Sequence, residues 1–343
     1  MNSKFMSRLD LAEADALERY KLGMGESFPT PVHVEVISND QFGARVFESG
    51  YGYTIQVNSA ALSGIEQLWQ QALQSTVLID DAGNRIKNAD GSALTLERLA
   101  HLSLTWLVLH ELMHIRLGHL DLLGSAQLVE TESEESADEF WQRNSIADIA
   151  NVLSPKERAL FRPCLELQAD NEATEVMFGI FAESEWGRFR IEAAAIFVVM
   201  ALMEKADKDS TDRTKTYPRV ATRFFTLFAQ LFQYWLYPGA ELKAGDRESF
   251  VNTPRKPQGK DFERYMKQEL AFAINDAVQI ALWAEARAFL IDLGEGSALF
   301  KDIFEIQYAN NLGKAKLNTN AAKEWRELLP VNEKIMAASS LRE

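Results

Sequence analysis

The stretch His110-Glu111-Leu112-Met113-His114 lies within a mostly apolar run, about residues 95–118, that is typical of one long helix. Side chains at positions i and i+4 of a helix share a face, so His110 and His114 can bind the same metal ion. Glu111 lies about 100° round the helix from His110, close enough to hold a water molecule on that ion. The pattern predicts a metal site with Glu111 as general base.

A catalytic zinc ion needs a third protein ligand and leaves a fourth position open to water. The chain has no third histidine at a suitable spacing after the motif, and Cys164 is its only cysteine. The best candidates are the two carboxylates of Glu166-Leu-Gln-Ala-Asp170, in a second predicted helix of about residues 156–182. Glu166 and Asp170 share a face, so one would bind the metal while the other accepts the N–H of a ligand histidine.

Composition restricts the other possibilities. The 343 residues are 47% hydrophobic and 25% charged, which is typical of a globular protein, and the net charge is −14. An acidic chain argues against nucleic-acid binding, which needs a basic surface. A single cysteine excludes an intrachain disulfide framework and any metal site built from cysteines.

No segment has the character of a membrane span. The longest strongly apolar run without charge, residues 193–203, is far shorter than the roughly 20 residues that cross a bilayer. The first ten residues lack the apolar region of a secretory signal. We therefore expect a soluble, cytoplasmic protein with no membrane span and no nucleic-acid partner.

The N-terminal part and the remainder of the chain have different periodicities. Alternating, β-branched segments at residues 32–37, 44–47 and 53–57 predict a small antiparallel sheet within about residues 30–58. Beyond residue 95 the helical period dominates. The predicted class is α+β and mostly helical, with a small N-terminal sheet and a large helical C-terminal part.

A change in composition suggests where the chain divides. Residues 237–260 combine prolines, glycines and mixed charges, as linkers do. The sequence therefore predicts one domain at 1–236, a linker at 237–260 and a helical C-terminal region at 261–343, whose role the sequence does not indicate.

The chain resembles the gluzincin metallopeptidases, in particular the prenyl-protease and heat-shock-protease type, in HELMHIRLGH (110–119) and the later ELQAD (166–170). The resemblance implies a zincin-like fold for residues 1–236 and one Zn²⁺ ion. It also implies site residues: metal ligands His110, His114 and Glu166, the catalytic base Glu111, and Asp170 as the support of a ligand histidine.

The same group often carries a His-Pro pair followed by an arginine five residues after the proline. Here Tyr217-Pro218 and Arg223 keep that spacing, with tyrosine in place of histidine. A tyrosine hydroxyl can donate a hydrogen bond to a tetrahedral oxyanion. Tyr217 is therefore a candidate oxyanion donor, and Arg223 a further candidate catalytic residue.

Two other histidines near the motif are not expected to bind the metal. His101 lies nine residues before His110, which puts it on the opposite face of a helix. His119 follows Gly118, which we expect to end the helix.

Together these features predict a zinc-dependent endopeptidase acting on a protein or peptide substrate. Strand 53–57 is the segment expected to pair with an extended substrate. The alternative is a sensor or antirepressor-like interaction protein that keeps the fold with little or no proteolysis. Glu111 and His114 also form a Glu-x-x-His pair, which is half of the motif of di-iron oxidases. We reject a di-iron oxidase because the sequence has no second Glu-x-x-His.

Overall fold

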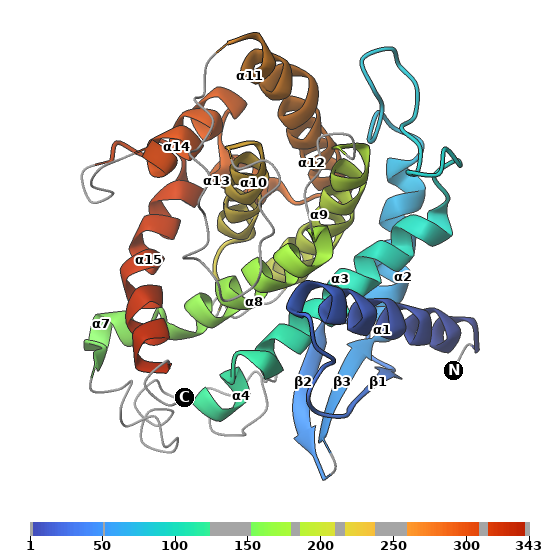
Figure 1. The fold of residues 1–343 in the computed structure, drawn as a ribbon, viewed down its shortest axis with the longest axis vertical. Helices are drawn as coiled ribbons and strands as arrows, with labels where there is room; N and C mark the ends of the chain where they lie inside the picture. The colour runs from blue at the N-terminus through green and yellow to red at the C-terminus, as the bar shows by residue number, and fades with distance from the viewer. Residues whose placement is uncertain are drawn as a thin grey trace.

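The computed structural model describes residues 3–50, 52–123, 152–179, 186–209, 217–236, 259–308 and 315–339. These residues are mostly helical, with one small sheet near the N-terminus, as predicted (Figure 1). None of their helices has the length and apolar character needed to cross a membrane.

The elements follow one another in three groups. The first contains α1 (Ser3–Met24), β1 (Val32–Ile37), β2 (Ala44–Ser49), β3 (Gly52–Asn58) and α2 (Ser59–Ala72). The second contains α3 (Leu96–Arg116), α4 (His119–Leu122), α7 (Pro155–Arg158), α8 (Phe161–Phe178), α9 (Trp186–Asp209) and α10 (Val220–Leu236). The third contains α11 (Lys260–Arg264), the π-helical segment Tyr265–Leu270, α12 (Ala271–Trp283), α13 (Arg287–Leu293), α14 (Gly296–Tyr308) and α15 (Asn320–Ser339).

The sheet is mixed, with strand order β1-β3-β2. Strand β2 pairs antiparallel with β3, whereas β1 pairs parallel with β3. The prediction of an antiparallel sheet is therefore right for one pair and wrong for the other. Alternation along the chain identifies strands, but the pairing depends on which strand returns to the centre of the sheet.

Gly52 is required where β3 begins. The backbone N–H of Tyr53 donates to the carbonyl of Pro31 at 3.0 Å. A Cβ atom on Gly52 would lie only 2.2 Å from that carbonyl oxygen. A glycine here therefore allows the start of β3 to lie against the segment that leads into β1.

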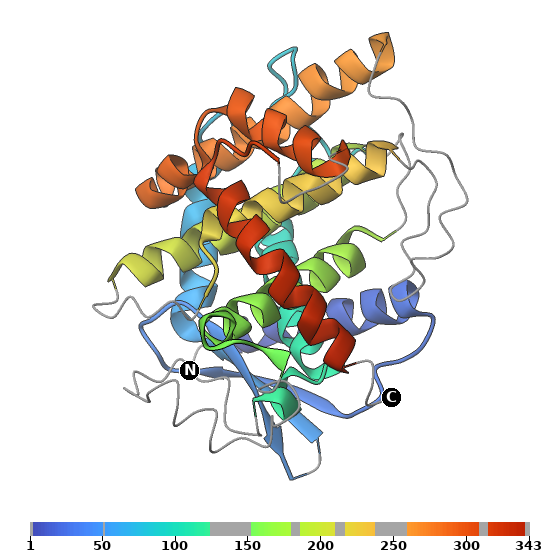
Figure 2. The same ribbon diagram turned by 90° about the vertical axis from the view of Figure 1, so that its left-hand side faces the viewer.

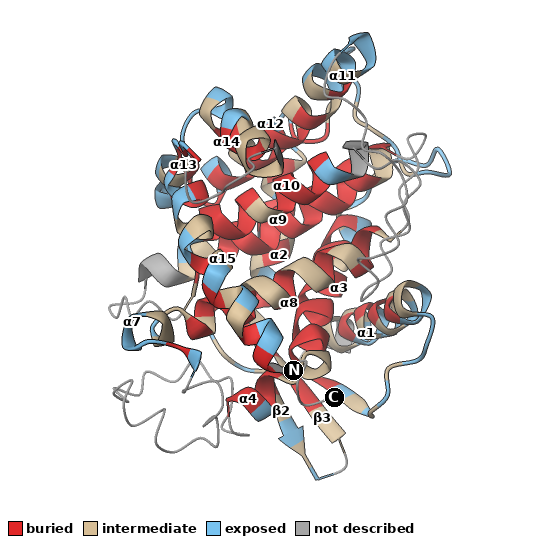
Figure 3. Ribbon diagram, turned by 60° about the vertical axis from the view of Figure 1, so that its left-hand side comes forward, coloured by how far each residue is buried: buried red, intermediate tan, exposed pale blue. Residues whose placement is uncertain are grey.

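Helix α3 lies at the centre of the molecule. It begins at Thr95, whose side chain accepts a hydrogen bond from the N–H of Arg98, and its residues from Leu99 to His114 are all buried apart from the partly buried His101. It packs against α1, α2, α8 and α9 and against the sheet. Figure 3 shows that α3, α9 and α10 are largely buried. The predicted helix at 95–118 is confirmed.

The second predicted helix is divided. Helix α7 carries a capping box at Ser154, and α8 starts at Phe161 and stops before Gly179, whose φ is 58°. The prediction of one helix over 156–182 is therefore wrong at both ends. Its central part, with both predicted carboxylates, is helical and packs along α3.

The C-terminal helices join the same core as the N-terminal part. Figure 2 shows the sheet at one end of the molecule and α11–α14 at the other, with α15 running between them. One hydrophobic cluster includes buried residues from Leu9 in α1 to Ala322 in α15. The predicted division at 237–260 stays a prediction, because residues 237–258 lie outside the described part.

A buried ion pair joins α9 to α12. Arg190 contacts Asp276 with its Nε at 2.6 Å and its Nη2 at 2.9 Å. Asp276 also accepts from the N–H of Leu78 at 2.8 Å, and Arg190 donates to the carbonyl of Ile79 at 3.0 Å. Three segments distant in sequence are thus joined around one pair of charges.

Replacing Asp276 by Asn should strongly destabilise the fold, because Arg190 would be left as a buried charge without its counter-ion. We expect the free energy of unfolding to fall by about 3–5 kcal/mol in urea denaturation. Lys267→Ala is the control, since Lys267 and Glu263 form an exposed pair, and it should change stability by less than about 0.5 kcal/mol. Equal stability of both variants would contradict the role of the buried pair.

Candidate metal centre

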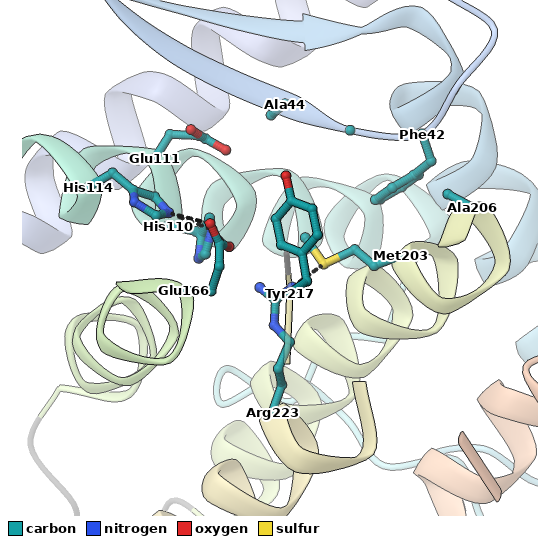
Figure 4. A pocket seen from close by; sticks show the side chains of 11 residues that line it. Phe42, Ala44, His110, Glu111, His114, Glu166, Met203, Ala206, Tyr217 and Arg223 are labelled. Carbon is teal, nitrogen blue, oxygen red and sulfur yellow. Dashed lines mark hydrogen bonds and ion pairs between the residues drawn. The ribbon is translucent and has the colours of Figure 1, made fainter. Parts of the chain in front are cut away.

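Three predicted ligands come together between α3 and α8. The Nε2 atoms of His110 and His114 are 3.1 Å apart. Glu166 places Oε2 3.4 Å from Nε2 of His110 and Oε1 3.6 Å from Nε2 of His114. All three side chains are buried and converge on one point (Figure 4).

These distances fit a single cation. Ligand atoms about 2.0–2.1 Å from a tetrahedral ion are about 3.3 Å from one another. The 3.1 Å between the two imidazole nitrogens lies close to this value, and each imidazole has a different oxygen of Glu166 at 3.4 or 3.6 Å. Two imidazoles and one carboxylate suit zinc and other first-row divalent ions. The cluster could therefore hold a metal ion.

The local charge also favours a cation. Burial by itself lowers the pKa of His110, but its contacts with Asp170 and Glu166 outweigh burial and raise it to about 10. Burial by itself raises the pKa of Glu166, but His114 and His110 outweigh burial and lower it to about 2. The carboxylates thus stabilise positive charge at this point, whether a proton or a metal ion supplies it.

Asp170 lies between a predicted ligand and a buried arginine. Its Oδ1 is 3.0 Å from Nδ1 of His110, an ion-pair contact in which the ring N–H is not aligned for a hydrogen bond. Arg223 binds both oxygens, with Nη2 at 2.6 Å and Nε at 2.5 Å. Burial would raise the pKa of Asp170, but the guanidinium of Arg223 and the contact with His110 hold it well below its usual range. An ionised Asp170 can orient the His110 ring.

Helix α10 carries Arg223 to this position, and α8 presents Glu166 and Asp170 one turn apart. The register of α8 on α3 is supported by a buried hydrogen bond, in which the indole N–H of Trp106 donates to Thr174 at 3.3 Å. Arg223 was predicted from the sequence as a catalytic candidate. It lines the pocket and contacts both Asp170 and the sulfur of Met203.

A pocket adjoins the cluster. Besides the predicted ligands and Arg223, it is lined by Glu111, Tyr217 and the residues Phe42, Gly43, Ala44, Met203 and Ala206. Its volume is about 60 Å³, which is room for a few water molecules. Figure 4 shows the carboxylate of Glu111 and the hydroxyl of Tyr217 extending toward the space between the cluster and Ala44.

His119 contacts the cluster without belonging to it. It is fully buried, and its Nδ1 lies 2.9 Å from Nδ1 of His114. Gly118 ends α3 as predicted, but its φ of 66° reverses the chain and brings His119 back against the helix. Helical spacing cannot reveal this contact. His101 points away and pairs with Asp15 at 2.9 Å, in keeping with its predicted orientation.

Comparisons of the chain with protein-family models, curated proteins and solved structures found no match.

Removing the carboxylate of the cluster should weaken metal binding. Glu166→Ala is expected to lower zinc affinity by at least about 100-fold, measured by competition with a chromogenic chelator. Glu172→Ala is the matched control on the same helix, because Glu172 pairs with Arg116 at 3.0 Å. It should bind zinc as the parent does. Equal loss in both variants would contradict the assignment of Glu166.

Proposed function

We propose that the protein is a zinc-dependent endopeptidase that hydrolyses peptide bonds in a protein substrate. The observation that carries the proposal is the buried cluster of His110, His114 and Glu166, with Glu111 lining the adjoining pocket. Three protein ligands leave a coordination position open, as a catalytic zinc site requires.

The polar residues of the site have distinct chemical roles in this proposal. Zinc, when bound, supplies a Lewis acid that polarises the scissile carbonyl and acidifies water. Glu111 accepts the proton of the attacking water and passes it to the leaving amine. The hydroxyl of Tyr217 donates a hydrogen bond to the oxyanion that forms. Arg223 keeps Asp170 ionised, and Asp170 orients His110.

The substrate strand is β2 rather than β3. The expectation that residues 53–57 pair with substrate is wrong, because β3 is paired on one side with β1 and on the other with β2. Among the described residues, β2 has no strand on its outer edge. Gly43 and Ala44, where β2 begins, line the pocket. We propose that an extended peptide adds to this edge, with its scissile bond beside the metal centre.

Glu111→Gln should greatly slow cleavage while the metal stays bound, since a carboxamide cannot accept the proton. We expect peptide-bond cleavage to fall by about 10²–10⁴-fold. Terminus mapping of a cell lysate treated with parent or variant would identify the substrates and measure the loss. Glu97→Gln, at an exposed position of the same helix, is the control and should cleave like the parent.

Two outcomes would contradict the proposal. Cleavage by Glu111→Gln at the rate of the parent would refute the role of Glu111. Parent protein that binds zinc, cleaves nothing and retains a tight protein partner would instead favour the sensor or antirepressor-like alternative.

Tyr217→Phe should test the oxyanion role separately. Loss of one oxyanion donor lowers kcat by about 10²–10³-fold, and we expect KM and zinc content to stay near those of the parent. Steady-state kinetics on a peptide found by terminus mapping would measure this. An unchanged kcat would remove Tyr217 from the mechanism.

A further inference from the structure

A chain of hydrogen bonds runs from a predicted metal ligand to the C-terminal helix α15. His114 contacts His119 through their Nδ1 atoms at 2.9 Å. The Nε2 of His119 lies 2.9 Å from Oε1 of Gln168, and Nε2 of Gln168 donates to Oδ1 of Asn332 at 2.7 Å. We refer to His119, Gln168 and Asn332 as the relay.

The relay has one direction of donation if His114 binds a metal. The Nε2 of His114 faces the cluster, so its lone pair must bind the metal and its proton must lie on Nδ1. His119 then accepts at Nδ1 and carries its own proton on Nε2, which donates to the carbonyl oxygen of Gln168. The amide of Gln168 is left to donate to Asn332. Every group has a role that its chemistry allows.

The far end of the relay is firmly anchored. Leu328, Val331 and Ile335 of α15 are buried in one cluster with Phe161, Cys164 and Leu165 of α8. A separate ion pair joins Lys334 to Glu157 of α7 at 2.7 Å and involves no residue of the relay. Asn332 is therefore held against α8 by the packing on both sides of it along the helix.

We propose that α15 is a positioning element of the metal centre. Gln168 and Asn332 hold His119, and through it His114, in the tautomer and orientation that bind the metal. This inference rests on the proposed metal centre and gives a role to a C-terminal helix whose purpose the sequence did not indicate. Gln168 and Asn332 are positioning residues, since their effect reaches the metal only through the two histidines.

Two pairs of variants of the full chain test the relay. Gln168→Met removes the acceptor for His119 at similar size, whereas Gln168→Glu retains an oxygen acceptor and Asn332 can rotate its amide to donate to it. Asn332→Leu removes the acceptor for Gln168, whereas Asn332→Asp retains it. Lys334→Ala is the control, because it removes a partly exposed ion pair between α15 and α7 without touching the relay.

The measurements are zinc affinity by chelator competition, the visible spectrum of the Co²⁺-substituted protein, and the Tm of the metal-free protein. We expect Gln168→Met to lower zinc affinity by about tenfold, the lower end of the effect of residues that support a metal ligand. Asn332→Leu should lower zinc affinity by about threefold, which is below that range. Both should alter the Co²⁺ spectrum. Gln168→Glu, Asn332→Asp and Lys334→Ala should keep the affinity and spectrum of the parent.

The outcomes separate the inference from the proposed function. If the parent binds zinc and Gln168→Met binds it equally, with an unchanged Co²⁺ spectrum, the relay has no effect on the metal and the inference is overturned. Equal weakening by Gln168→Met and Gln168→Glu, or weakening that follows the Tm and includes Lys334→Ala, shows a packing role and also overturns it. A parent that binds neither ion refutes the metal centre itself, and the relay with it.

Discussion

The structure depends on the burial of ionisable groups between α3 and α8. Buried charges are tolerated only when they are paired, and Asp170 meets this condition by contacting His110 on one side and Arg223 on the other. Glu166 faces the two imidazoles of the motif, where a cation would complete the balance of charge. The position of α10, which brings Arg223 to Asp170, follows from the same requirement.

The elements around α3 and α8 leave a small pocket beside the buried cluster. The sheet and α9 pack against α3, and α10 packs against α8 and α9. Helix α9 carries Met203 to the pocket and helix α10 carries Arg223. The pocket forms where these parts meet, with β2 on its rim and Glu111 and Tyr217 in its lining. Among the described residues no strand pairs with the outer edge of β2, and this edge beside the pocket is the basis of the proposal that an extended peptide adds there.

The C-terminal helices are part of the same core. Arg190 and Asp276 join α12 to α9 and to the segment after α2. Helix α15 packs on both α8 and α10, which carry the acidic and the basic residues of the site. It thus contacts both helices that carry Glu166, Asp170 and Arg223, and the proposed relay would extend its influence to His114.

The sequence by itself determined the local features, because helical periodicity relates residues within a turn: the shared face of His110 and His114, and that of Glu166 and Asp170. It could not determine the parallel pairing of β1 with β3, the bond between Arg223 and Asp170, or the contact of His119 with His114. Each of these depends on how the chain reverses, at Gly118 for example, and on which helix then packs against which. Those choices are made by the burial of the whole core, so only the tertiary structure decided them.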